Sequence, residues 1–181
     1  MMTSTNKRKA NHNAIQLSRR FIWLIGLFFV NQIYAATPKP CTTDEYRQFD
    51  FWIGEWEVKN ASGKTVGHNK IFPVMNGCAL SENWTSARGN SGVSYNFYDQ
   101  AEKKWHQTWV DQNGGVLYLD GSLDNNKMVL KGYRPDKEGK QVLHKISWTP
   151  MKDGRVKQHW QSSTDEGKAW TEVFVGFYSK K

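Results

Sequence analysis

The stretch "WHQTWVDQNGGVLYLDG", Trp105 to Gly121, has two runs rich in aromatic and β-branched residues on either side of a short turn sequence. Aromatic and β-branched side chains are favoured in strands. The central "QNGG" supplies residues that tolerate the positive φ angles of a hairpin turn. The stretch therefore predicts a β-hairpin, with strands at 104–112 and 116–123.

The same alternation of turn and strand repeats along most of the chain. The turn sequences are "NASGK", "MNG", "ARGNSG", "DQAEKK", "QNGG", "DNNK", "PDKEGK", "MKDGR" and "TDEGK". The strands that they delimit are expected at 49–59, 65–74, 78–86, 92–99, 104–112, 116–123, 127–134, 141–149, 155–163 and 168–178. We interpret the glycines as turn residues. A short helix is expected at 42–49, where "TTDEYRQF" has early acidic residues.

Ten strands joined in sequence by hairpins leave two unpaired edges unless the sheet closes on itself. Closure removes those edges, so we expect an all-β fold, an up-and-down antiparallel barrel of about ten strands. A flat two-sheet sandwich is the alternative. A propeller is excluded because ten strands would form fewer than three four-stranded blades.

The N-terminal segment has the three parts of a secretory signal peptide. Residues 1–35 contain five Lys and Arg and no acidic residue, with the apolar run "FIWLIGLFFV" at 21–30. Cleavage after Ala35 would leave a single domain, 36–181, in the periplasm or outside the cell. An uncleaved anchor is the alternative, but ten apolar residues are about half of the ~20 that span a bilayer, so no stable membrane span is expected after cleavage.

The charge of the chain belongs mostly to that segment. The full sequence has 25 Lys and Arg against 17 Asp and Glu, and without residues 1–35 the balance is 20 against 17, a net of +3. No cluster of basic residues with interleaved aromatics remains, which argues against nucleic acid as a partner.

Two cysteines, Cys41 and Cys78, follow the predicted cleavage site. A pair of cysteines in an exported protein predicts a disulfide. A reactive or metal-binding thiol pair is the alternative, although the two residues lack the C-x-x-C spacing.

The segment "SSTDEGKAW", Ser162 to Trp170, resembles the Asp-box of sialidases and other propellers. A single box without an arginine cluster does not predict a glycosidase. We expect a hairpin corner, in which Asp165 accepts hydrogen bonds from turn N–H groups, Gly167 adopts a positive φ and Trp170 folds over the turn.

The segment "FDFWIGEWEV", Phe49 to Val58, resembles the entrance of calycin-type barrels such as lipocalins and nitrobindins. Gly54 and Trp56 match their Gly-x-Trp signature, which implies that Trp56 closes one end of the barrel. Together with "GCALSENW", "GVSYNFYD", "WHQTWVD", "GRVKQHWQSSTDEGKAW" and a final "GFY", it makes residues 41–178 resemble a family of exported bacterial proteins, a domain of unknown function. That resemblance implies the fold and no activity.

Residues two apart on a strand share a face, and four predicted strands place tryptophan beside polar groups. A concave aromatic surface with a few convergent polar groups is typical of a small-molecule site. The polar residues expected to orient a ligand are Glu82, Gln107, Asp111 and Gln158, and the stacking residues are Trp84, Trp109 and Trp160. Alternatively, these tryptophans face outward or belong to the core, where a polar neighbour satisfies them.

The sequence leaves two alternative functions open, a catalytic one and haem binding. Glu82 and Asp111 would form an acid/base pair for a hydrolase or isomerase if both face inward, although the sequence favours no catalytic role. Haem binding through His144 is the other, because nitrobindin-type barrels hold haem through one histidine. The nitrobindin pattern G-x-W-x-G-x-G is broken here, since Glu57 and Val58 follow Trp56. No zinc spacing is present among the histidines, so no metal site is expected.

Overall fold

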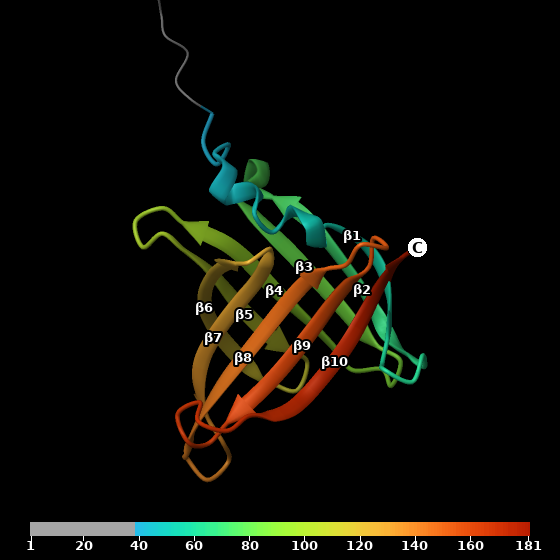
Figure 1. The fold of residues 1–181 in the computed structure, drawn as a ribbon, viewed down its shortest axis with the longest axis vertical. Coiled ribbons are helices and arrows are strands. Elements are labelled where there is room, and N and C mark those ends of the chain that lie inside the picture. The colour runs from blue at the N-terminus through green and yellow to red at the C-terminus, as the bar shows by residue number, and fades with distance from the viewer. Residues whose placement is uncertain (1–38) are drawn as a thin grey trace, which may run out of the picture. The chain divides into compact units, whose positions relative to one another are not determined.

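Ten antiparallel strands close into a barrel in the computed structural model, which describes residues 39–181 (Figure 1). The strands are β1 (Gly54–Lys59), β2 (Thr65–Val74), β3 (Ala79–Ser86), β4 (Ser91–Asp99), β5 (Lys104–Asp111), β6 (Val116–Asp124), β7 (Lys127–Pro135), β8 (Gln141–Pro150), β9 (Val156–Ser163) and β10 (Thr171–Lys180). Each strand pairs with the next, and β1 pairs with β10. The predicted up-and-down barrel is confirmed, and the sandwich alternative is wrong.

The predicted N-terminal helix is present as two short 3-10 turns, η1 (Asp44–Arg47) and η2 (Asp50–Trp52). The strand predicted at 49–59 begins five residues late, at Gly54, because η2 occupies its first half. Gly54 has a φ of 153°, and a Cβ there would lie 3.2 Å from the indole of Trp56. Only glycine meets both conditions easily, which explains the spacing of Gly-x-Trp.

An aromatic cluster fills the barrel where the 3-10 turns cover it. Phe49 stacks on Trp52 with ring centroids 4.9 Å apart, and both rings contact Trp148 at 5.2 Å. Trp56 donates its indole N–H to the carbonyl of Trp52 at 2.9 Å. These side chains, with Trp105, are at most 2% exposed. We call this end of the barrel the aromatic plug. Burying one large apolar side chain stabilises a fold by about 1.5–3 kcal/mol, so these rings form the main core.

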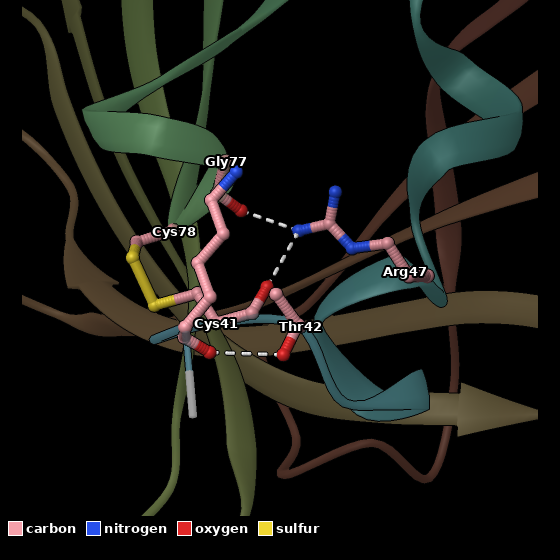
Figure 2. Close-up of a disulfide and its surroundings, with 6 residues drawn as sticks. Cys41, Thr42, Arg47, Gly77 and Cys78 are labelled. Atoms are coloured by element: carbon pink, nitrogen blue, oxygen red, sulfur yellow. Dashed lines mark hydrogen bonds between the residues drawn. A yellow bond between two sulfur atoms is a disulfide. The ribbon is translucent and has the colours of Figure 1, made fainter. Parts of the chain in front are cut away.

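The predicted disulfide is confirmed and holds the plug segment in place. Cys41 and Cys78 are bonded across a separation of 37 residues, next to the turn η3 (Met75–Gly77). The Arg47 guanidinium reinforces this junction by donating to the carbonyl oxygens of Gly77 and, at 3.3 Å, of Cys41 (Figure 2). A cross-link around a loop of this length stabilises the fold by about 3–4 kcal/mol on the chain-entropy model.

The Asp-box forms the corner between β9 and β10, as predicted. Asp165 accepts the N–H of Ala169 at 2.9 Å, and Gly167 has a φ of 90°. The Trp170 ring lies over Gly167, and the ammonium of Lys145 lies 3.8 Å from a ring centroid of Trp170. The box therefore stabilises a turn on the outside of the barrel.

The described residues, 39–181, belong to one compact unit. The predicted signal peptide, 1–35, lies outside the described residues. In the part of the chain that the structure describes, no helix is both long and apolar enough to cross a bilayer.

Candidate ligand-binding site

A cavity of about 310 Å³ opens into the barrel beyond the aromatic plug. Its lining comprises Glu82, Trp84, Gln107, Trp109, Leu117, Ile146, Gln158, Trp160, Val173, Phe174 and Tyr178. Six of the seven predicted ligand-binding residues are in this set. The exception is Asp111. Binding sites for small molecules occupy about 300–1,000 Å³, so this cavity is at the small end of the range.

Strand alternation brings these side chains together, because the inner face of each strand contributes every second residue. On β3 and β5 the pattern holds as expected, with Glu82 and Trp84 on one strand and Gln107 and Trp109 on the other. A bulge interrupts it on β10 between Glu172 and Phe174. There the consecutive residues Val173 and Phe174 both line the cavity, which strict alternation does not predict.

Two of the tryptophans lie against glycines in the neighbouring strands. A Cβ at Gly67 would come within 2.5 Å of the Trp84 indole, and one at Gly92 within 2.3 Å of the Trp109 indole. Both glycines are inside strands, so the interpretation of the glycines as turn residues is wrong for them. Because glycine has no side chain, the rings of Trp84 and Trp109 fit closely against the neighbouring strands.

A chain of buried hydrogen bonds leads to Glu82. Gln107 Nε2 donates to Asn96 Oδ1 at 2.9 Å, and Asn96 Nδ2 donates to Ser94 Oγ at 2.9 Å. Ser94 Oγ then donates to Glu82 Oε2 at 2.6 Å. From the other side, Asn69 Nδ2 donates to Glu82 Oε1 at 2.7 Å. Every donor in this polar chain is oriented toward the carboxyl group, and hydrogen bonds in such a row polarise one another.

Burial shapes the acid–base properties of this end of the cavity. Removal from water raises the pKa of Glu82 above its ordinary value, against the lowering effect of the hydrogen bonds from Ser94 and Asn69. Tyr178 donates its hydroxyl proton to Gln158 Oε1. Burial, and secondarily the negative charge of Glu82, raise the pKa of Tyr178. Glu82 is therefore a carboxyl group in a largely apolar space, and the hydrogen bonds from Ser94 and Asn69 stabilise its charged form.

Asp111 has a different place from the one predicted. Its Oδ1 accepts the backbone N–H groups of Asn113 at 2.8 Å and Gly115 at 2.9 Å, so the side chain stabilises the turn between β5 and β6. It is not in the lining of the cavity. The acid/base pairing of Asp111 with Glu82 therefore has no support in this geometry.

His144 contacts the site without lining it. Its Nδ1 accepts the indole N–H of Trp160 at 3.0 Å, which leaves the ring proton on Nε2. Burial lowers the pKa of His144. A cavity of about 150 Å³ admits benzene, so a space about twice that size does not suit the four-pyrrole ring of haem. These residues do not fit the haem hypothesis.

The sequence did not reveal the polar residues behind Glu82. Ser94 and Asn96 are at most 2% exposed, whereas Tyr95, between them, is 54% exposed. The usual rule that polar residues face solvent would therefore assign the inner and outer faces of β4 the wrong way round. The usable signal is the position of Ser94 opposite Glu82 and of Asn96 opposite Gln107 in the strand register.

No protein-family model fits the chain, and no curated protein is significantly similar to it. The closed ten-stranded barrel agrees with the calycin-like fold that the Gly-x-Trp resemblance implied.

Proposed function

We propose that this chain is an exported barrel protein that binds a small, partly apolar molecule in its lumen. The observation that carries the proposal is the cavity of about 310 Å³ in which half-buried indole rings meet buried polar groups. A core made only for stability would fill such a space, since protein interiors pack with few voids larger than a water molecule.

The composition of the lining supports binding of an amphipathic ligand. Trp84, Trp109 and Trp160 offer flat apolar surfaces, and Glu82, Gln107 and Gln158 offer hydrogen-bonding groups. The binding energy would come from apolar contact, and the orientation from the polar groups. We propose these six residues as the ligand-binding set.

Export through cleavage after Ala35 is part of the same proposal. The disulfide Cys41–Cys78 supports an oxidising compartment, either the periplasm or the extracellular space. The resemblance of residues 41–178 to a family of exported bacterial proteins points the same way. Expression of the full chain in a secreting bacterial host, with mass spectrometry of the product, tests this step. A product that retains residues 1–35 would contradict it.

Binding is tested with 2-phenylethanol as a neutral probe and the indole N–H signals of the protein in nitrogen-15 NMR spectra. We expect the signals of Trp84 and Trp109 to shift in a saturable way. The signals of Trp56 and Trp105, which belong to the plug, serve as internal controls and should stay in place.

A cavity-filling variant provides the matched control. Leu117 lines the cavity and Val110 is on the outer face of the adjacent strand. Leu117→Trp should abolish the shifts, and Val110→Trp should leave them unchanged. Equal shifts in both variants would contradict binding in the lumen, as would a wild-type protein that shows no shift with 2-phenylethanol or with its amine and carboxylate analogues.

A further inference from the structure

Hydrogen-bond acceptors dominate the polar end of the cavity. Each carboxyl oxygen of Glu82 takes part in one hydrogen bond and has capacity for another. Gln107 uses its Nε2 toward Asn96, and within residues 39–181 its Oε1 has no partner. Asn69 Oδ1, beside Glu82, is also buried and without a partner among the described residues. The donors left among the lining residues are the amide Nε2 of Gln158 and the indole N–H groups of Trp84 and Trp109.

Among residues 39–181, no positive charge compensates Glu82. The lining contains one acidic residue and no lysine, arginine or histidine. A carboxylate removed from water without a counter-ion is costly, and hydrogen bonds offset only part of that cost. A ligand that brings a positive charge would provide the missing partner.

The aromatic surfaces select the same kind of ligand. Trp84 follows Glu82 by two residues on the same face of β3, and Trp109 and Trp160 also line the cavity. The faces of indole rings attract cations, and aromatic cages are a known means of recognising organic ammonium groups. The same rings also accept an apolar ligand body.

The volume limits the ligand to a small one. An engineered cavity of about 150 Å³ in another protein binds benzene, so about 310 Å³ accommodates one or two rings with a short side chain.

We infer that the ligand of this cavity is a small organic amine in its protonated form, whose ammonium group donates to Glu82 and to Gln107 Oε1 while its apolar body lies against the tryptophans. This inference rests on the proposed binding function and narrows it to one class of ligand. Glu82 is then a specificity residue, because it distinguishes a cation from a neutral molecule of the same shape.

The test compares two probes with the same carbon skeleton, 2-phenylethylamine and 2-phenylethanol, by calorimetric titration of the full-length protein at pH 7. We expect the amine to bind at least about tenfold more tightly than the alcohol, and 3-phenylpropionate, an anion of similar size, to bind more weakly than the alcohol. Glu82→Gln should lower the affinity for the amine to that for the alcohol. Glu55→Gln, which removes a carboxylate on the exposed outer face of β1, should keep the preference.

The outcomes separate this inference from the proposed function. Alcohol binding that equals or exceeds amine binding in the wild-type protein would overturn the amine inference and leave the binding function standing. Absence of binding by all three probes would overturn both. The wild-type ranking of the probes decides the inference even if Glu82→Gln fails to fold, because it needs no variant.

Discussion

The two ends of the barrel place the same side chain, tryptophan, in different surroundings. In the aromatic plug, the indole rings of Trp52, Trp56, Trp105 and Trp148 are at most 2% exposed and contact one another or Phe49 and Tyr178. Around the cavity, the rings of Trp84, Trp109 and Trp160 are half-buried and lie beside polar groups. Tryptophan content alone therefore does not distinguish a core from a site.

The two ends differ in which side chains fill the lumen. At the plug, the segment before β1 places Phe49 and Trp52 inside the barrel, and the disulfide and Arg47 hold that segment down (Figure 2). Within the described part of the chain no comparable segment enters the cavity. Glu82 and Gln107 line part of its wall instead, joined by the buried side chains of Ser94 and Asn96. If the proposed function holds, stability and binding thus belong to different parts of one barrel.

The sharpest way to break this comparison is to remove one ring from each end. Trp148→Ala should lower the free energy of unfolding by about 3–5 kcal/mol, because it leaves an enclosed void among rings that are fully buried. Trp109→Ala should cost about 1–2 kcal/mol, since its ring already borders an open cavity. Urea denaturation followed by circular dichroism measures both changes. Equal losses would mean that the two ends do not differ in packing.

The fold was predictable from the chain because its strongest signals are local. Turn residues such as those of "QNGG" delimit the strands, and ten strands in sequence favour closure. The helical turn η1 was predicted, but η2 was not. Phe49 to Ile53 have the composition of a strand, and tertiary packing places η2 within them instead.

The site was predictable only in part, for two physical reasons. Six of the predicted residues line the cavity because tryptophan and polar groups at a spacing of two share a face of a strand. Asp111 was misplaced because a strand-end carboxylate can accept turn N–H groups as well as face the lumen. Ser94 and Asn96 were missed because polar residues inside a barrel contradict the usual polarity rule, and only the pairing with Glu82 and Gln107 reveals them.

A smaller change sharpens the comparison at the cavity wall. Gly92→Ala puts a methyl group about 2.3 Å from the Trp109 ring, so the ring must move. We expect a loss of about 1–3 kcal/mol in unfolding free energy, as for other overpacked sites, and a displaced Trp109 indole signal. The same substitution in a Trp109→Ala background should cost clearly less, because the clash is gone. An equal cost in both backgrounds would show that Gly92 is needed for backbone reasons alone.

The smallest expected effect concerns pH and the rim of the cavity. The Trp160 indole donates to Nδ1 of His144, which requires the neutral ring, and burial lowers the pKa of His144. Its register partners Gly132 and Ser162 carry no titratable side chain. Below the ordinary histidine pKa of about 6.5, the unfolded chain binds a proton that the folded protein resists. The contribution of His144 to stability is therefore present above that pH and is lost as the pH falls toward 5.

His144→Gln isolates this contribution, since the side-chain oxygen of glutamine can accept the same hydrogen bond and does not titrate. We expect the unfolding free energy of the wild-type protein to fall relative to that of the variant between pH 7.5 and pH 5. The buried carboxyl of Glu82, whose raised pKa acts in the opposite direction, is present in both proteins and cancels in the difference. A difference that stays constant with pH would show that His144 is equally free to bind a proton in the folded and unfolded chains. In that case Trp160 would be held by packing, as the rings of the plug are, and the distinction between the two ends would be weaker at this position.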